Sequence, residues 1–413
     1  MVSINIKHIG PVKDTGVVRI TPVTLLIGKQ SSGKSTIMKI LCYCSWVEKR
    51  IMVDGESQLT KYTHYNRFIK ELKTFHHFDD EYFSEESEFH YWGAAVKIDY
   101  LPGASNVKIT KVSGYGKIRH NEKISFIPSE RNVASAIQNV EKSYKASDYD
   151  VIFNYLLEYN EAKFDYTKEK PITIPFDSNM SYYFDSKEGD RVIINNLHRP
   201  IEPLYTSSGV QSALPLIIIA THVMNLAGST AKSSISDITN AISKILLGND
   251  KDKNLETLSS LDLKRVSSLI NYQCSKLFVE EPEQNLFPIS QYDIVLYLIR
   301  CLNEAKLKSK NNDNFIVMTT HSPYVLTTLN YLIKYSDAYN KSRERHQDDF
   351  DKHLVIPVDE FSAYALNEDG TCSDIVDRVD KFISGDYLDS LSDILNEKES
   401  KLNNILYGEG EVD

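Results

Sequence analysis

Residues 28–35 have the sequence Gly28-Lys29-Gln30-Ser31-Ser32-Gly33-Lys34-Ser35, which matches the phosphate-binding loop pattern G-x-x-x-x-G-K-[ST]. The residues before it include the apolar Val23, Leu25 and Ile27, as in a buried strand, and apolar residues recur at helical spacing from Ile37 to Val47. By average composition, the pattern should occur by chance roughly 0.015 times in a chain of this length. This succession of strand, glycine loop and helix predicts an α/β fold that binds phosphate at the start of the helix.

Each part of this loop has a chemical role. Gly28 and Gly33 let the backbone wrap around the phosphates, so that successive N–H groups face negative charge. Lys34 is expected to place an ammonium on the terminal phosphates, and the Ser35 hydroxyl to ligate the Mg²⁺ that bridges them. ATP and Mg²⁺ are therefore the expected ligands. The expected nucleotide-binding residues are Gly28, Lys29, Gln30, Ser31, Ser32, Gly33, Lys34, Ser35 and Thr36.

Two later apolar segments end in polar residues that suit phosphate chemistry. Residues 276–279 lead into Glu280-Glu281-Pro282-Glu283, and residues 314–320 lead into His321. Open parallel sheets bind ligands at the carboxyl ends of their strands, so these side chains are expected beside the phosphate loop. Glu280 is expected to hold Mg²⁺, directly or through water, Glu281 to polarise the attacking water, and His321 to hydrogen-bond the γ-phosphate or that water. The alternatives are a solvated acidic turn and a structural histidine.

A third polar group precedes a helix. Thr206-Ser207-Ser208-Gly209-Val210-Gln211 is followed by an apolar stretch from Ser212 to Met224. Hydroxyls and a glycine at a helix start can form an anion site, although Ser before Gly is also ordinary capping. Because Gly28 to Ser35 already serves the chain's own nucleotide, this second site is expected to serve another nucleotide.

In this order the motifs resemble those of the ABC-type ATPase superfamily: a Walker A loop, a signature motif, a Walker B strand with a D-loop, and a switch histidine. The strings Glu280-Glu281-Pro282-Glu283 and Thr320-His321-Ser322-Pro323 are similar to the branch that holds the overcoming-lysogenization-defect (OLD) proteins and related bacterial defence ATPases. Within it the chain looks most like the ATPase subunit of the PARIS system, with Septu and retron-associated ATPases as rivals. The cues for PARIS are residues 46–49 and 127–132. The resemblance implies an α/β P-loop ABC-type ATPase head with a mixed sheet, flanking helices and inserted helical lobes.

The resemblance also implies an assembly. ATP would lie between two copies of the head, and residues of one signature motif would cap the γ-phosphate held by the other copy, as a dimer or a higher ring. The signature residues are Ser207, Ser208, Gly209 and Gln211; the catalytic residues are Glu281, His321 and Lys34; the metal ligands are Ser35 and Glu280. Such a chain is expected to regulate a separate effector protein, for which a nuclease is one candidate, in response to a phage-encoded trigger. Arg131 either reports nucleotide state to the lobes or forms a structural salt bridge.

Length and composition are those of an ordinary globular protein. The 413 residues are expected to form a single head (1–413) with an inserted lobe (52–94), a helical insertion (132–170), a polar helical lobe (227–261) and a carboxy-terminal extension (331–413). A net charge of -10 disfavours an all-over nucleic-acid-binding surface but leaves local basic patches open. Five cysteines without a CxxC pair, no long apolar run and no secretion signal predict a cytoplasmic protein without a membrane partner.

Rival functions make distinct demands on the sequence. The ATPase subunit of a membrane transporter would normally carry a compact insertion for coupling helices, which the polar lobes at 55–92 and 226–261 do not fit well. A DNA-end-handling or repair ATPase of the recombination/SMC type predicts a long coiled coil between the Walker motifs, and no sustained heptads occur between Ser35 and Gly209. A nuclease of the OLD kind needs a second carboxylate cluster. The only candidate, around Asp386 and Asp389, lies in a polar context that predicts a solvated turn, so the chain is expected to have no nuclease of its own.

Overall fold

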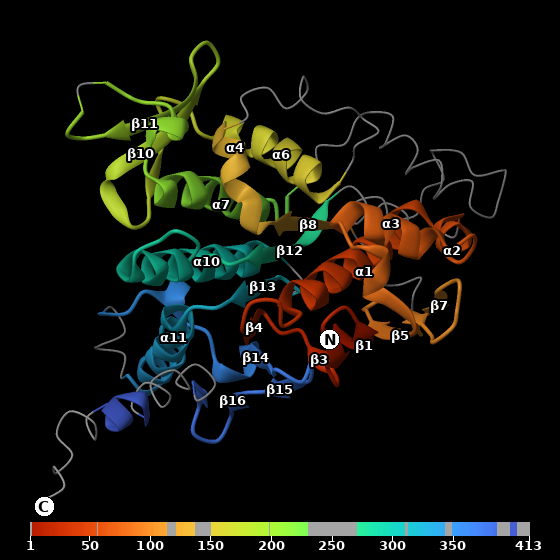
Figure 1. Cartoon of the computed structure of the whole chain (residues 1–413). Coiled ribbons are helices and arrows are strands. Elements are labelled where there is room, and N and C mark those ends of the chain that lie inside the picture. The colour runs from red at the N-terminus through yellow and green to blue at the C-terminus, as the bar shows by residue number, and fades with distance from the viewer. Residues whose placement is uncertain are drawn as a thin grey trace, which may run out of the picture.

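A six-stranded sheet forms the centre of the protein, in the strand order β15-β14-β4-β13-β12-β8. The computed structural model describes residues 2–55, 57–113, 121–136, 150–197, 199–229, 271–309, 313–342, 349–385 and 397–402. The central strands are β8 (Asn121–Ile127), β12 (Tyr272–Glu280), β13 (Phe315–Thr320), β4 (Val23–Gly28) and β14 (Phe361–Leu366), all parallel, with β15 (Cys372–Asp374) antiparallel at one edge. The carboxyl ends of five strands therefore meet at one edge of the sheet (Figure 1).

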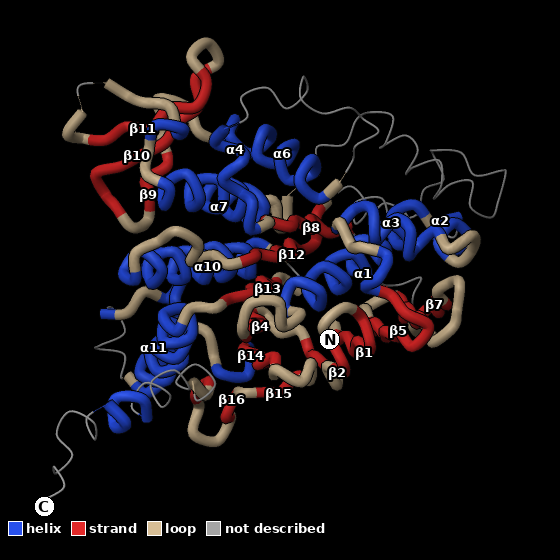
Figure 2. Tube along the Cα trace, in the orientation of Figure 1, coloured by secondary structure: helices blue, strands red, loops and turns tan. Residues whose placement is uncertain are grey.

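Helices cover both faces of this sheet, because successive residues of its buried strands point to opposite sides. Leu25 and Ile27 of β4 face a core shared with α7 (Ser208–Asn225), α10 (Pro288–Lys308) and α11 (Pro323–Lys341). Leu26 faces a second core with α1 (Lys34–Asp54). Figure 2 shows the two helical layers on the two sides of the strands. In the described part of the chain, no helix is both long and apolar enough to cross a membrane.

A second, antiparallel sheet packs on the far side of α1. Its order is β2-β1-β5-β6-β7, and β3 pairs with β1. The strands are β1 (Ser3–Ile9), β2 (Val12–Asp14), β3 (Val18–Arg19), β5 (Phe83–Trp92), β6 (Val96–Tyr100) and β7 (Lys108–Lys111). Glu48 of α1 is fully buried and accepts hydrogen bonds from Tyr91 Oη at 2.5 Å and from the Ala95 N–H at 2.6 Å. This carboxylate fixes the outer half of α1 to the sheet.

The structure describes the secondary structure of several of the expected lobes. Residues 52–94 contain α2 (Ser57–Tyr62), α3 (Arg67–His76) and strand β5 of the second sheet. Residues 132–170 contain α4 (Val133–Ala136) and α6 (Val151–Ala162), and a small sheet follows, formed by β9 (Ile172–Ile174), β10 (Asp177–Asp185) and β11 (Gly189–Ile194), which the sequence did not predict. Of the lobe at 227–261, residues 230–261 lie outside the described residues, as do Asp386 and Asp389.

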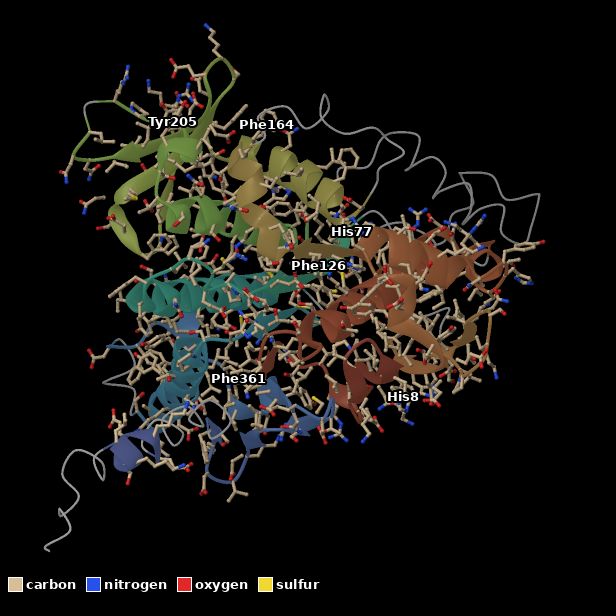
Figure 3. The ribbon with its side chains drawn as sticks, in the orientation of Figure 1. His8, His77, Phe126, Phe164, Tyr205 and Phe361 are labelled. Carbon is tan, nitrogen blue, oxygen red and sulfur yellow. The ribbon has the colours of Figure 1, made fainter. Side chains whose placement is uncertain are left out.

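Residues 331–413 contribute two strands to the central sheet. They include β14, which pairs in parallel with β4, and β15, which closes that edge of the central sheet. A short hairpin of β16 (Val376–Asp377) and β17 (Phe382–Ile383) follows. Phe361, labelled in Figure 3, is buried at the start of β14. The strand that carries the phosphate loop is thus flanked by residues from far along the chain.

Candidate functional site

The loop between β4 and α1 has the shape that its glycines allow. Gly33 has φ 102°, in the left-handed region, and directly precedes α1. A Cβ at Gly28 would lie 2.7 Å from Ser32 Oγ, and one at Gly33 would lie 2.6 Å from Val12 Cγ2. Both positions therefore require glycine. The top of the loop, Lys29 to Ser31, is exposed, so an anion can approach the backbone and the start of α1.

Lys34 is buried at the centre of the loop. Its Nζ donates to the carbonyl oxygens of Gly28 at 2.8 Å and Lys29 at 2.7 Å, and lies 3.3 Å from His321 Nδ1. Burial lowers the pKa of Lys34 to about 8, while the nearby carboxylates of Glu281, Glu283 and Glu280 act in the opposite direction. Neutral carbonyl oxygens therefore accept the hydrogen bonds of this ammonium. Phosphate oxygens can take their place and form stronger, charge-assisted hydrogen bonds.

The acidic end of β12 lies beside this lysine. Glu280 is buried, and it is held by hydrogen bonds from the Ser35 side chain and from the Ser129 N–H, the latter at 3.2 Å. Burial raises the pKa of Glu280. A serine hydroxyl and a carboxylate in contact at a phosphate loop are hard oxygen ligands of the type Mg²⁺ prefers, and the ion would take its other ligands from phosphates and water. The expected pair, Ser35 and Glu280, therefore fits this metal.

Glu281 and His321 form the exposed side of the same cluster. Glu281 Oε1 lies 3.1 Å from His321 Nε2, and the two side chains are 34% and 29% exposed. His321 Nδ1 faces the Lys34 ammonium, a donor, so Nδ1 accepts and Nε2–H donates to the carboxylate. Lys34, His321 and Glu281 thus form one hydrogen-bonded chain that solvent and substrate can reach.

Two further residues, neither of them among the expected catalytic, nucleotide-binding or metal-binding residues, hold this cluster in place. Glu283 accepts hydrogen bonds from Thr320 Oγ1 at 2.6 Å and from the His321 N–H at 3.0 Å, so it fixes the end of β13. The only sequence signal for Glu283 was its place in the acidic string 280–283. That string did not show that Glu283, rather than Glu280 or Glu281, has this structural role. The other residue is Arg131.

Arg131 is completely buried just after β8. Its guanidinium donates to the backbone carbonyls of Glu280 at 2.7 Å, Glu281 at 2.6 Å and Ser212 at 3.0 Å. These partners belong to the end of β12 and the first turns of α7. Of the two roles considered for Arg131, a salt bridge does not occur among the described residues: the side chain instead links the acidic end of β12 to α7 through backbone carbonyls.

The signature residues form a separate group. Ser207 caps α7 by accepting from the Val210 N–H at 3.4 Å, and Gln211 Nε2 donates to the carbonyls of Leu204 at 2.7 Å and Thr206 at 3.0 Å. Ser208 is exposed at the helix start. A Cβ at Gly209 would lie 2.8 Å from the Asn285 carbonyl oxygen, so the loop after β12 packs directly on this turn. The group is thus available to an anion from outside.

Comparisons with known proteins address the fold. No family model matches the chain, and no curated protein sequence matches it. The SMC head domain from Thermotoga maritima is 10% identical, with 79% of this chain and 90% of that chain covered and a TM-score of 0.34. A Pyrococcus furiosus Smc head with an extended coiled coil, bound to the C-terminal domain of ScpA, is 10% identical, with 97% and 100% covered and a TM-score of 0.37. A dimeric bacterial ABC transporter cassette is 12% identical, with 89% and 95% covered and a TM-score of 0.27.

The chain has an α/β architecture with a mixed sheet and flanking helices, as the sequence predicted, and its phosphate loop joins a parallel strand to a helix in the arrangement typical of P-loop proteins. The elements that define it are strand β4, the glycine loop, α1, and the acidic end of the parallel strand β12, which is separated from β4 by β13.

Proposed function

We propose that this chain binds and hydrolyses ATP with Mg²⁺, giving ADP and phosphate. The observation that supports it is the cluster at one sheet edge, where the ends of β4, β13 and β12 bring Lys34, His321 and Glu281 into a hydrogen-bonded chain beside the Ser35 and Glu280 pair. These are the groups that phosphoryl transfer to water needs: a cation for the phosphates, ligands for Mg²⁺ and a carboxylate for the attacking water.

The contacts suggest how nucleotide assembles the site. Lys34 exchanges the carbonyls of Gly28 and Lys29 for phosphate oxygens, which relieves part of the cost of burying its charge. Ser35 and Glu280 would hold Mg²⁺, which would neutralise negative charge on the phosphates. His321 keeps its backbone anchor on Glu283 while its ring orients the γ-phosphate or water, and Glu281 accepts a hydrogen bond from the attacking water.

We further propose that ATP is clamped between two copies of the chain, with Ser207, Ser208, Gly209 and Gln211 of one copy facing the phosphate loop of the other. The start of an 18-residue helix with an exposed serine is suited to a γ-phosphate. Exposed apolar side chains surround it: Tyr205 is 71% exposed and Phe287 75%. Figure 3 labels Tyr205 on the lobe that carries β10 and β11. Such an apolar rim favours burial against a partner.

Glu281→Gln tests the hydrolytic site. The amide keeps the shape of the carboxylate but no longer acts as a base for water, so we expect unchanged ATP binding and a loss of turnover on the order of 10² to 10⁴. Glu304→Gln on α10 is the matched control and should behave as the parent. Hydrolysis by the Glu281→Gln protein within twofold of the parent would exclude Glu281 from this role.

Mixing tests the composite site. Ser208→Arg should block hydrolysis while ATP still binds to the same subunit's loop, and Lys34→Ala should be inactive because it lacks the phosphate cation. A mixed pair holds one intact composite site, so combining the two inactive proteins should restore part of the activity. Ser186→Arg, at an exposed serine in the β10–β11 turn, is the control. No recovery, in samples whose mixed assembly is verified by mass, means that each subunit hydrolyses alone.

We propose that the ATPase regulates a separate effector in a bacterial anti-phage system. The support is the resemblance of the Glu280–Glu283 and Thr320–Pro323 strings, and of residues 46–49 and 127–132, to defence ATPases of the OLD-like and PARIS type. ATP can shift the equilibrium between two states of the complex with an effector only as far as its affinities for the two states differ. Moving the populations from 1:99 to 99:1 requires a difference of about 5.5 kcal/mol. The two ATP sites of a dimer would together have to supply this difference.

The test is to purify the chain alone and together with the product of its neighbouring gene, and to assay DNA and RNA cleavage with Mg²⁺ or Mn²⁺. We expect no cleavage by the chain alone and ATP-dependent control of the partner. Metal-dependent cleavage by the isolated chain contradicts this division of roles. ATP-dependent binding of DNA ends by the chain alone would instead support the repair-type ATPase considered above.

A further inference from the structure

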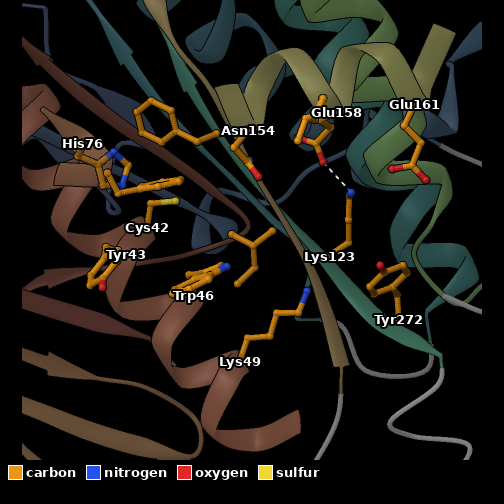
Figure 4. Close-up of a pocket in the computed structure, with 14 residues that line it drawn as sticks. Cys42, Tyr43, Trp46, Lys49, His76, Lys123, Asn154, Glu158, Glu161 and Tyr272 are labelled. Carbon is orange, nitrogen blue, oxygen red and sulfur yellow. Dashed lines mark ion pairs between the residues drawn. The ribbon is translucent and has the colours of Figure 1, made fainter. Parts of the chain in front are cut away.

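A pocket lined by aromatic and charged side chains lies far from the phosphate loop. A cavity of about 240 Å³ opens between the outer half of α1, the end of α3, strand β8, helix α6 and the start of β12 (Figure 4). Lys49, one of its lining residues, is 15 positions after Lys34 on the same helix. At a rise of 1.5 Å per residue this corresponds to about 22 Å along the helix axis. The pocket is therefore separate from the proposed ATP site.

Its walls have two chemically different halves. In Figure 4, Tyr43, Trp46 and His76 lie on one side, and Lys123, Glu158 and Glu161 lie with Tyr272 on the other. On the aromatic side, Tyr43 and Trp46 are stacked with ring centroids 5.8 Å apart, and His76 meets Phe126 edge-on at 5.1 Å. On the charged side, Lys123 and Glu158 form an ion pair of 2.7 Å next to Lys49 and Tyr272. A ligand that spans the pocket needs a flat apolar part and a polar part.

His76 leaves hydrogen-bonding capacity unused in the aromatic half. The side chain is fully buried, and neither Nδ1 nor Nε2 has a hydrogen-bond partner among the described residues. Burial lowers the pKa of His76 well below its usual value, so the imidazole is neutral and offers one donor and one acceptor. An unsatisfied buried polar group costs about 1–3 kcal/mol, which a ligand atom can recover.

Lys49 is the corresponding feature of the charged half. Its Nζ lies 5.5 Å from the ring centroid of Tyr272, and no carboxylate of the described residues lies within ion-pair distance of it. The two carboxylates that raise its pKa are already paired, Glu158 with Lys123 and Glu122 with Lys276, and Glu161 also lines this end of the pocket. Burial lowers the pKa of Lys49 to about 8, so the ammonium is charged at neutral pH, and no described residue forms an ion pair with it. This end of the pocket therefore favours an anion over a cation.

We propose that this pocket binds a small aromatic anion, with its ring among Tyr43, Trp46, His76 and Phe126 and its acidic group on the Lys49 ammonium. The cavity is just below the range of about 300–1,000 Å³ that holds drug-sized ligands, so it fits one or two rings with a short acidic arm and excludes a nucleoside triphosphate. The inference goes beyond the proposed ATPase and does not depend on hydrolysis.

The test uses 3-phenylpropionate as the probe, with two comparison compounds. 3-Phenylpropionamide keeps the ring without the charge, and acetate keeps the charge without the ring. Isothermal titration of the full chain should show 3-phenylpropionate binding at least tenfold tighter than either comparison compound. The fluorescence of Trp46 should change on binding, and Trp46→Phe should remove that change. Equal affinities for the acid and the amide, or no binding of any probe, would overturn the proposal.

Two lysine variants separate this site from general surface charge. Lys49→Met keeps the apolar stem and removes the ammonium, and it should abolish the preference for acid over amide while leaving binding of the amide unchanged. Lys97→Met, at an exposed lysine on β6, should keep the full preference. A preserved preference in Lys49→Met contradicts the assignment, and an unchanged melting temperature verifies that the variant is folded.

A further probe identifies the natural source of such an anion. A short peptide with a free carboxy-terminal phenylalanine carries the same ring and carboxylate as 3-phenylpropionate. Tighter binding of this peptide assigns the pocket to the chain end of a protein partner. Tighter binding of the free acid assigns it to a small metabolite. Both results require Lys49, and both support the proposal.

Discussion

Arg131→Lys is the substitution that most directly tests how the proposed catalytic edge is built. The buried guanidinium donates to three backbone carbonyls, those of Glu280, Glu281 and Ser212, at 2.7, 2.6 and 3.0 Å. A hydrogen bond to a charged group contributes about 1.5–3 kcal/mol. A lysine ammonium is a single point and cannot reproduce the planar fork, so at least one carbonyl, and in our expectation two, would lose its donor. We expect a loss of unfolding free energy of about 2–4 kcal/mol.

The effect on turnover is expected to be larger than the effect on binding. The carbonyls that Arg131 holds belong to the two residues proposed to ligate Mg²⁺ and to polarise water, and a displacement of about 1 Å at such a position can cost roughly 10² in rate. Lys34 and the glycine loop do not contact Arg131, so we expect ATP affinity within about threefold of the parent. Steady-state hydrolysis, ATP titration and urea unfolding measure the three quantities.

Arg300→Lys is the matched control, because Arg300 is a partly exposed arginine of α10 that pairs with Asp351 at 2.6 Å. Exposed ion pairs contribute about 0–1 kcal/mol, so this variant should resemble the parent in all three assays. If Arg131→Lys hydrolyses ATP within twofold of the parent and unfolds at the same urea concentration, the link between the acidic strand and the signature helix has no energetic importance.

Three shorter predictions concern other parts of the molecule. Lys34→Ala should weaken ATP binding itself, and an unchanged affinity in direct titration would contradict the phosphate-loop assignment. Glu48→Ala should lower the unfolding free energy by about 3 kcal/mol, since buried donors on the second sheet lose their acceptor; a loss below about 1 kcal/mol in urea unfolding would count against this. His90 lies 2.7 Å from Asp99 and 2.6 Å from Glu88, and these hydrogen bonds outweigh partial burial and raise its pKa. The stabilisation from this raised pKa is complete below about pH 6.5, the pKa of histidine in the unfolded chain, and is lost as the pH rises through the pKa of the folded protein. His90→Gln should therefore destabilise the protein more at about pH 5.5 than at about pH 9. Thermal unfolding at the two pH values measures this difference.

The parts of the site that the sequence predicts are those controlled by local chemistry. The glycine loop needs particular residue types at fixed spacing, and the buried strand and helix around it follow from periodicity. The approach of Glu281 and His321 to Lys34 also follows, because polar residues at the carboxyl ends of parallel strands must share one sheet edge. Sequence reasoning reached these contacts without knowing which strands are neighbours.

The parts that it missed depend on long-range pairing. Phe361–Leu366 is a short apolar run whose place beside β4 depends on pairing with a strand more than 300 residues earlier, such as Ala363 with Leu25. Nothing local specifies that register. The contacts of Arg131 were not predicted for a related reason: arginine is rarely fully buried, and its partners here are backbone carbonyls. Those carbonyls converge only after β12 and α7 have been placed, so no residue pattern marks them.

The position of Arg131 has a consequence for the proposed pair of subunits. The acidic strand end serves the subunit's own nucleotide, whereas the signature turn on α7 is proposed to serve the nucleotide of the partner. Since one buried side chain donates to both, a shift of Glu281 when γ-phosphate is bound or lost cannot leave the Ser212 turn unaffected. The two ATP sites are then coupled, and linkage requires the coupling to act equally in both directions. Couplings of this kind typically amount to about 1–3 kcal/mol, which changes affinity about 5- to 150-fold. The ATP affinity of the intact site in mixed dimers with one Lys34→Ala subunit can be compared with the affinity in dimers that have two intact sites, and the difference measures the coupling. Arg131→Lys should therefore reduce this difference. An equal difference with arginine and with lysine would show that the coupling follows another route.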